Sequence, residues 1–252
     1  MIISHKYKII FVKCGKVAGT SVEMALRPFL DDHDVITPVA ARDELFAHEN
    51  GFPAPRNFKN SVFYDDRVQY GSSRGVFYEH AWAYEIKGLV SSEVWNSYFK
   101  FAIERDPREK SLSTYYHNRN GIRWPKFRNA LNAIQSLLPL PIPLPLAHPS
   151  IAKFVSLERW LQEDREHTFC DNWCRYTVND ELIIDRVYAF SELNTLVEDL
   201  GKIVGSDINL PRLKADFREN RNLSSSELEL LDNLLDNDTY RKEFELISKK
   251  SN

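Results

Sequence analysis

Apolar residues along the chain gather in short runs and in helical periods, and the runs predict three β-strands. Tyr7–Lys13 is an apolar, β-branched and aromatic run of strand length, and a short glycine-containing turn follows it. Phe99–Glu104 and Glu181–Phe190 have a similar character further along the chain. We expect these three segments to form the core of one sheet.

Helical patterns lie between and after these runs. Thr20–Leu30 opens with hydroxyl residues and carries apolar side chains at helical spacing, so it predicts a helix that ends near Pro28. Asp106 is a candidate N-cap, and Pro107 stands at a favoured first-turn position for a helix that runs to about Arg119. Further helices are expected over 81–90, 92–98, 151–163, 193–204, 224–236 and 240–247. Alternating strands and helices predict an α/β fold with a mostly parallel sheet and helices on both faces.

We expect a single domain over residues 1–252 with loop insertions at 49–75 and 137–150 and C-terminal helices at 222–252. The first insertion is rich in Pro, Gly, Asn, Ser and charged residues. The second contains a Pro-Leu arm over 139–149, whose prolines exclude a helix or a central strand. Loops of this kind often build binding pockets and vary widely, so the sequence leaves their ligand unidentified.

Composition narrows the class of protein. Hydrophobic residues make up 43% of the 252 residues and charged ones 27%, which excludes wholesale disorder. The net charge of −3 excludes a broad basic surface for nucleic acid. Apolar runs stay shorter than the roughly 18 residues of a membrane span, and Met1–Lys8 has no apolar secretory region. Three cysteines form no disulfide framework. We therefore expect a cytoplasmic protein without a membrane span; its oligomeric state stays open.

The turn after the first strand carries the candidate anion-binding residues Gly15, Lys16, Val17, Ala18, Gly19, Thr20 and Ser21. A helix N-terminus offers free backbone N–H groups, and Gly19 lets an anion approach them. Thr20 and Ser21 add hydroxyl donors, and Lys16 adds a full charge. These features predict a phosphate or sulfate cradle, and the alternative is an ordinary strand-to-helix turn. The Gly-Lys-Ser/Thr of a nucleotide-binding P-loop is missing, which argues against the alternative hypothesis of a kinase that uses ATP and Mg²⁺.

A second anion-binding segment follows the second predicted strand. Arg105 would lie at the carboxyl end of that strand, where open α/β sheets bind ligands. Ser113 lies two turns into the following helix, close enough to bind the same anion. A guanidinium grips phosphate in a bidentate way, and a hydroxyl completes the grip. The alternative is a surface arginine paired with Glu104 or Asp106.

Together, a strand followed by KxAGTS and a strand followed by RDPxxxxxS resemble the sulfotransferases that use 3′-phosphoadenosine-5′-phosphosulfate (PAPS), in their carbohydrate-type branch. The resemblance extends to 94–101 and 185–193 and covers about 7–220. It implies a P-loop-like three-layer fold, a 5′-phosphosulfate on Lys16–Ser21 and a 3′-phosphate on Arg105 and Ser113. Gly15-Lys16-Val17 stands where that branch commonly has Pro-Lys-Thr. No membrane anchor is present in the sequence, which favours a bacterial-type cytoplasmic enzyme.

The resemblance assigns catalytic roles to Lys16 and His80. Lys16 would stabilise charge on the departing nucleotide, and His80 would take the acceptor proton, since a histidine titrates near neutral pH. Glu79 is a second candidate base, or a residue that orients His80. The acceptor would be a hydroxyl or an amine of a carbohydrate or small molecule, and no metal would be required. A non-catalytic nucleotide-binding protein of the same fold remains the alternative outside enzymes.

The remaining candidates favour a structural role. His167, Cys170 and Cys174 have a poor zinc-binding spacing, so we interpret the cysteines as reduced and structural. Lys214 and Arg218 either reach the cofactor or form a solvated basic patch. The two proposed binding segments are locally basic: residues 1–27 hold five Lys or Arg against one Glu, and 99–130 hold eight against three acids.

Overall fold

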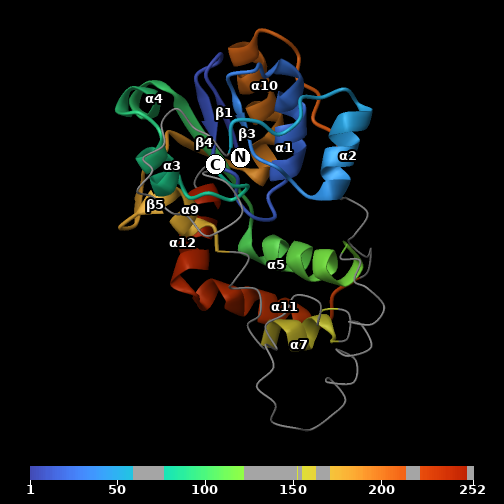
Figure 1. Cartoon of the computed structure of the whole chain (residues 1–252). Coiled ribbons are helices and arrows are strands. Elements are labelled where there is room, and N and C mark those ends of the chain that lie inside the picture. Colours follow the sequence, from blue (N-terminus) through green and yellow to red (C-terminus); the bar gives the residue numbers. More distant parts are fainter. Residues whose placement is uncertain (59–76, 122–151, 153–154, 163–170, 214–221, 249–252) are drawn as a thin grey trace, which may run out of the picture. The chain divides into compact units, whose positions relative to one another are not determined.

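The computed structural model describes residues 1–58, 77–121, 152, 155–162, 171–213 and 222–248 (Figure 1). Contacts divide the chain into two compact units. The first comprises Met1–Arg105, Asn172–Leu213 and Glu245–Asn252, and the second comprises Asp106–Asp171 and Lys214–Phe244. A single domain over 1–252 stays a prediction. The Pro-Leu arm and most of the insertion at 49–75 lie outside the described residues.

A five-stranded sheet forms the centre of the first unit. In spatial order its strands are β3 (Val35–Ile36), β1 (Ile2–Ser4), β2 (Ile9–Phe11), β4 (Phe99–Glu104) and β7 (Arg186–Ala189). The pairs β2–β4 and β4–β7 are parallel, whereas β1 is antiparallel to both β2 and β3. Four of the five strands therefore run in one direction. This confirms the prediction of an α/β chain with a mostly parallel central sheet.

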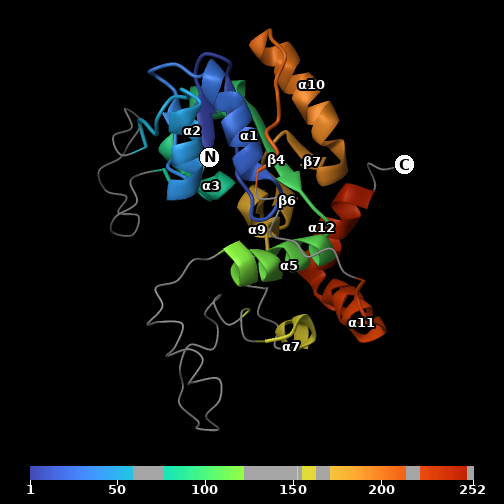
Figure 2. The same cartoon turned by 90° about the vertical axis from the view of Figure 1, so that its right-hand side faces the viewer.

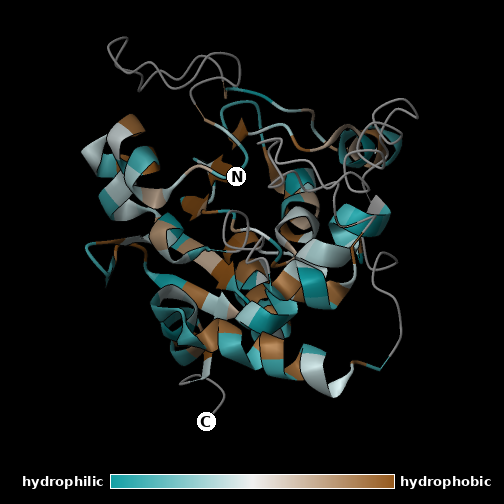
Figure 3. Cartoon of the chain, turned by 90° about the horizontal axis from the view of Figure 1, so that it is seen from below, coloured by the Kyte–Doolittle hydropathy of each residue, from teal (hydrophilic) through white to brown (hydrophobic). Residues whose placement is uncertain are grey.

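The central strands are buried because their sequences are apolar along their whole length. In β2, Ile9, Ile10 and Phe11 are fully buried, and Phe11 stacks on Phe101 of β4 with ring centroids 5.0 Å apart. Hydropathy follows the same division, since the strands are mostly hydrophobic and the helices carry both kinds of residue (Figure 3). The carboxyl ends of β2 and β4 therefore lie at the edge of the buried core. The predicted loop 15–21 follows β2, and Arg105 follows β4.

Helices lie on both sides of this sheet. Figure 1 shows α1 and α10 on one side of the strands and α3 and α4 on the other, and Figure 2 shows α10 beside β7. The predicted helices at 20–30, 81–90, 92–98 and 193–204 are confirmed with small shifts of their ends. The helices of the first unit are α1 (Gly19–Leu26), α2 (Ala41–Glu49), α3 (Ala83–Leu89), α4 (Ser92–Ser97), α9 (Trp173–Tyr176) and α10 (Leu193–Val204).

The prediction of one strand over Glu181–Phe190 is wrong. Glu181–Leu182 forms β6, which pairs with β5 (Thr177–Val178) in a hairpin. The turn residues Asn179 and Asp180 both have positive φ, which is the geometry that closes a two-residue hairpin. β7 begins only at Arg186, and a 3₁₀ turn follows it at Phe190–Glu192. The apolar run 181–190 therefore contributes one strand to each of two different sheets.

The second unit is helical where the structure describes it. It contains α5 (Pro107–Tyr116), a π-helical turn at His117–Gly121, α7 (Leu157–Gln162), α11 (Ser225–Asn233) and most of α12 (Asp238–Ser248). The side chain of Asp106 accepts a hydrogen bond from the N–H of Arg108 at 2.9 Å, which confirms the predicted N-cap. Tyr115, Trp160 and Leu231 belong to its core. Among the described helices, none has the length and apolarity that crossing a membrane needs.

Candidate functional site

The loop between β2 and α1 has an unusual backbone. Lys16 has φ 60° and Ala18 has φ 63°, and both lie in the left-handed region that non-glycine residues avoid at a cost of about 1–2 kcal/mol each. Ala18 precedes the first helical residue, Gly19, and supplies no side-chain cap to α1. The first turn of α1 also carries no acidic residue. The N–H groups and the partial positive charge at the start of α1 therefore receive no side-chain cap from Ala18 and no acidic side chain from the first turn.

The predicted cradle residues differ in their exposure. Gly15, Lys16, Ala18 and Thr20 are partly exposed, whereas Val17, Gly19 and Ser21 are buried. Val17 belongs to the core, so only its backbone remains for a ligand. The Ser21 hydroxyl accepts a hydrogen bond from the N–H of Leu213 at 3.4 Å. Lys16 and Thr20 are therefore the side chains of this loop best placed to meet a ligand.

Gly19 has a packing role that the sequence did not indicate. A Cβ at this position would come within 2.8 Å of Cγ and 3.2 Å of Cε of Lys13. The glycine therefore makes room for the lysine side chain that runs beneath the loop. Close approach of a ligand to the backbone is a separate reason for a glycine here, and it stays a prediction.

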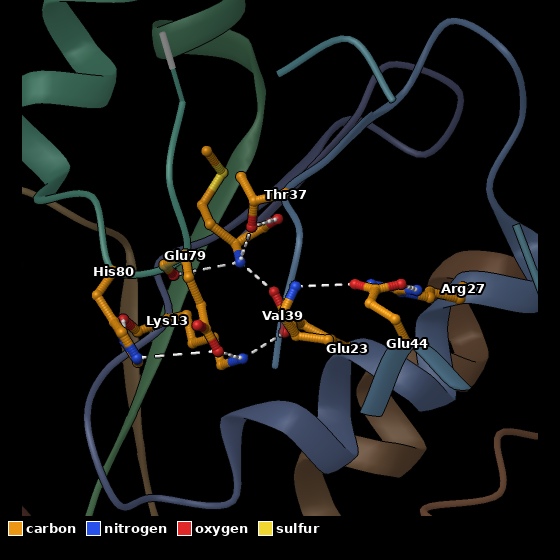
Figure 4. Close-up of polar contacts among 9 residues, drawn as sticks. Lys13, Glu23, Arg27, Thr37, Val39, Glu44, Glu79 and His80 are labelled. Atoms are coloured by element: carbon orange, nitrogen blue, oxygen red, sulfur yellow. Dashed lines mark hydrogen bonds and ion pairs between the residues drawn. The ribbon is translucent and has the colours of Figure 1, made fainter. Parts of the chain in front are cut away.

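Lys13 is the centre of a buried ion-pair network (Figure 4). Its ammonium contacts Oε2 of Glu23 at 2.5 Å and Oε1 of Glu79 at 2.6 Å. Burial alone would lower the pKa of Lys13, but the two carboxylates outweigh it and hold that pKa above its usual value. Glu23 also pairs with the ammonium of Met1, which donates to Oγ1 of Thr37 at 2.9 Å. The predicted first strand thus ends in a lysine that is neutralised inside the unit.

His80 is held against this network by its ring (Figure 4). Its Nδ1 lies 3.0 Å from the carbonyl oxygen of Lys13, and because a carbonyl only accepts, Nδ1 carries the proton. Nε2 is then an unprotonated acceptor, 3.9 Å from Oε1 of Glu79, on a side chain that is 38% exposed. Arg175 fixes the backbone by donating to the carbonyl oxygen of His80 at 2.8 Å.

The same surroundings keep the imidazole neutral. Burial disfavours the charged ring and, together with the nearby ammonium of Lys13, lowers the pKa of His80 to about 4. The carboxylate of Glu79 acts in the opposite direction and raises it. At neutral pH the ring is therefore uncharged, and its partly exposed nitrogen can accept a proton. Glu79 is less suited to that task, because the ammonium of Lys13 holds the pKa of its carboxyl below the usual value despite its burial.

Arg105 and Ser113 are described in separate units. Arg105 ends the segment that begins the first unit, and its guanidinium carbon lies 4.4 Å from the ring centroid of Phe190. Asp106 pairs with Arg108 at 2.8 Å. Ser113 is a partly exposed residue of α5 in the second unit. Their joint grip on one phosphate stays a prediction.

The structure places near the site some residues that the sequence did not mark. Lys13 was counted only among the five basic residues of 1–27. Arg27, another of those five, is fully buried and bonded to Glu44 at 2.8 Å. The basic count of residues 1–27 therefore overstates the charge that a ligand could meet. Asn172 and Arg175 stand beside the loop and His80 respectively, but no spacing or motif in the sequence marked them.

Several sequence candidates are not resolved by this geometry. His167, Cys170, Lys214, Arg218 and the arm at 139–149 lie outside the described residues. Cys14 is buried and Cys174 is partly buried, and both carry reduced thiols. Within the described ranges, no group of three or more His, Cys, Asp or Glu side chains is arranged to hold a metal ion. Whether the protein uses a metal stays a prediction.

Comparisons with known proteins return no relative: no family model matches the chain, and neither a curated protein nor a solved structure matches it significantly. Function is therefore argued from the residues of this chain.

Proposed function

We propose that the protein is a sulfotransferase that moves a sulfuryl group from PAPS to a hydroxyl or amine of a carbohydrate or small-molecule acceptor. The observation that carries the proposal is the bond between Nδ1 of His80 and the carbonyl of Lys13. Lys13 lies three residues before Lys16, so this bond holds a neutral base beside the loop proposed to bind the sulfuryl donor. Group transfer to a hydroxyl needs these two groups together.

In this proposal the donor nucleotide binds to the loop and to Arg105. Lys16, the hydroxyl of Thr20 and the first N–H groups of α1 surround the 5′-phosphosulfate. The guanidinium of Arg105, supported by the ring of Phe190, binds the 3′-phosphate. Ser113 is included on the sequence resemblance alone. A P-loop-like three-layer fold belongs to the same proposal, and the parallel order of β2, β4 and β7 supports it.

The chemical step requires one proton acceptor and one site of positive charge. The acceptor oxygen forms a bond to sulfur while the bond between sulfur and the phosphate oxygen breaks. The acceptor proton passes to Nε2 of His80. The electron pair of the broken bond stays on 3′-phosphoadenosine-5′-phosphate, where the ammonium of Lys16 stabilises the charge. Positioning and charge stabilisation supply most of the rate enhancement, as in phosphoryl transfer.

Glu79 and Lys13 support this step without touching the reacting atoms. Once His80 is protonated, its Nε2 is 3.9 Å from the carboxylate of Glu79, which stabilises the imidazolium. Lys13 holds that carboxylate in place at 2.6 Å. The network therefore favours a neutral ring before transfer and tolerates a charged ring during it. The second role that the sequence suggested for Glu79, the orientation of His80, stays a prediction.

Nucleotide binding tests the proposal before any acceptor is known. We expect 3′-phosphoadenosine-5′-phosphate to raise the melting temperature, because a ligand at 100 times its Kd stabilises by about 2.7 kcal/mol. ATP with Mg²⁺ is expected to give no comparable shift. Lys16→Ala should weaken calorimetric affinity by about tenfold to a hundredfold, the typical loss of one charged hydrogen-bond donor.

Lys8→Ala is the matched control for that variant. Lys8 is an exposed lysine with φ 52° at the opposite end of β2, so its replacement removes the same charge from a similar backbone conformation. We expect it to bind the nucleotide as the wild type does. A shift with ATP and Mg²⁺ alone would favour the kinase alternative. Equal losses in the two variants would show that the charge of Lys16 acts only through the overall field.

A further inference from the structure

We propose that Asn172 and Glu104 are positioning residues that fix the spacing between the 14–18 loop and Arg105, and so set the preference for a nucleotide with two phosphates. This inference rests on the proposed function. It concerns the side chains of Asn172, Glu104 and Tyr176, of which the sequence pattern marked only Glu104, as a possible partner of Arg105. All three are fully buried in the first unit.

The side chain of Asn172 binds both the N–H and the carbonyl of Gly15 in the loop. The N–H of Gly15 donates to Oδ1 of Asn172 at 2.8 Å, and Nδ2 of Asn172 donates to the carbonyl of Gly15 at 3.1 Å. A side chain that bonds both groups fixes the position and the orientation of that peptide. The strained backbone at Lys16 and Ala18 needs such support, because left-handed residues persist only where their surroundings hold them.

The same amide reaches the second binding segment through Glu104. Nδ2 of Asn172 is 3.2 Å from Oε1 of Glu104, and that oxygen also accepts the N–H of Arg105 at 2.8 Å. The other carboxylate oxygen accepts the hydroxyl of Tyr176 at 2.7 Å. Three donors thus stabilise a carboxylate that would be costly to bury alone. A continuous chain of hydrogen bonds runs from Gly15 through Asn172 and Glu104 to Arg105.

This chain of bonds connects the ends of two neighbouring parallel strands. Gly15 follows β2 and Arg105 follows β4, and β2 and β4 are paired in the sheet. A nucleotide with a 3′- and a 5′-phosphate has to contact both segments at once. A fixed spacing between the segments therefore lowers the entropy that is lost when the nucleotide binds. A nucleotide with one phosphate uses a single segment and gains little from that spacing.

Two variants and one matched control separate this role from general stability. Tyr176→Phe removes the hydroxyl that bonds to Glu104, and Asn172→Ala removes the amide that bonds to Gly15 and Glu104. Tyr188→Phe is the control, because Tyr188 is also buried and its hydroxyl also donates to a carboxylate, that of Asp199 at 2.9 Å. Asp199 belongs to α10 and has no recorded part in the chain of bonds above.

The measurement is calorimetric Kd for 3′-phosphoadenosine-5′-phosphate and for adenosine 5′-monophosphate, reported as their ratio. The ratio is insensitive to the folded fraction, because unfolded protein lowers both apparent affinities alike. We expect the preference for the bisphosphate to fall about threefold in Tyr176→Phe and about tenfold in Asn172→Ala, changes typical of one and of several lost buried hydrogen bonds. Tyr188→Phe should keep the wild-type ratio.

An unchanged ratio in Tyr176→Phe and in Asn172→Ala would overturn the inference while leaving the proposed function standing. An equal fall in Tyr188→Phe would also overturn it, because any lost buried hydroxyl bond would then suffice. If Asn172→Ala fails to fold, Tyr176→Phe decides the question, since it keeps the buried ring. Failure of the wild type to bind the bisphosphate would overturn the proposed function, and this inference with it.

Discussion

Two buried lysines in this chain make the same kind of bond in different surroundings. Lys110 pairs with Glu243 inside the second unit, both side chains are fully buried, and the ring of Tyr240 lies 5.8 Å from the ammonium. Lys13 pairs with Glu23 and Glu79 in the first unit, and the side chain of Glu79 is 32% exposed. The first pair lies wholly inside its unit, whereas the second continues to a half-buried imidazole.

This difference separates a packing role from a functional one. A buried ion pair is weak evidence for function or for stability, since its desolvation offsets much of its attraction. The network around Lys13 is informative because it ends at a titratable ring that can reach a ligand. Both side chains of the pair at Lys110 are fully buried, so neither charge is exposed to a ligand.

The largest expected effect is on stability, and it should be similar for the two lysines. Lys13→Met and Lys110→Met each remove the lysine from a buried ion pair and leave its carboxylate behind, which typically costs about 3–5 kcal/mol of unfolding free energy. Denaturant titration measures this loss. Sulfuryl transfer per folded molecule should fall in Lys13→Met, because Glu79 loses its anchor, and should stay at the wild-type rate in Lys110→Met.

Double variants sharpen the same contrast. Lys110→Met with Glu243→Leu removes both charges of a fully buried pair, so most of the lost stability should return. Lys13→Met with Glu23→Leu still leaves Glu79 without its lysine, so less of the lost stability should return. Equal recovery in the two double variants would show that the contact between Lys13 and Glu79 adds nothing to stability.

A smaller effect concerns the pH profile. His80 must be neutral to act as a base, so kcat/KM should fall only as the pH drops through its lowered pKa of about 4 and stay level from pH 6 to 8. The charged groups that face this ring are Lys13, Glu79 and Arg175. Because Glu79 raises the pKa of His80, Glu79→Gln should move the acid limb lower by about one pH unit. Glu243→Gln should leave it unchanged.

The same lowered pKa affects stability, with a definite sign. An unfolded histidine binds a proton below about pH 6.5, whereas His80 in the fold does not until about pH 4. Its contribution to stability is therefore present above pH 6.5 and is lost as the pH falls between these values. Profiles must be corrected for the folded fraction in this window. An acid limb near pH 6.5 would contradict the neutral, buried ring described above.

Local patterns in the sequence predicted much of the fold. β4, α5 with its cap at Asp106, and α10 were identified because propensity, capping and apolar spacing agreed within each segment. β1 and β3 were missed, since strands of two or three residues carry too little pattern. The hairpin at Thr177–Leu182 was merged with β7 because apolar content alone does not reveal where a chain leaves its sheet.

The candidate site divides in the same way. Lys16, His80 and Arg105 were predicted as site residues because they stand next to predicted element ends, where ligands often bind. Their supporting residues were not, because the contacts join distant parts of the chain: Asn172 reaches Gly15 across 157 positions, and Lys13 reaches Glu79 across 66. Such pairs have no local signature, so only the fold brings them together.

Sulfuryl transfer by the wild type and by His80→Asn tests the central claim most directly. An asparagine amide can still donate to the carbonyl of Lys13 but lacks the basic nitrogen, so nucleotide affinity should persist. With radiolabelled PAPS and a panel of glycans and small hydroxyl or amine acceptors, we expect transfer by the wild type and by His33→Ala, an exposed-histidine control. In His80→Asn the rate should fall about 10²- to 10⁴-fold, the usual contribution of a general base. No transfer by the wild type to any acceptor, or an equal rate in His80→Asn, would contradict the account.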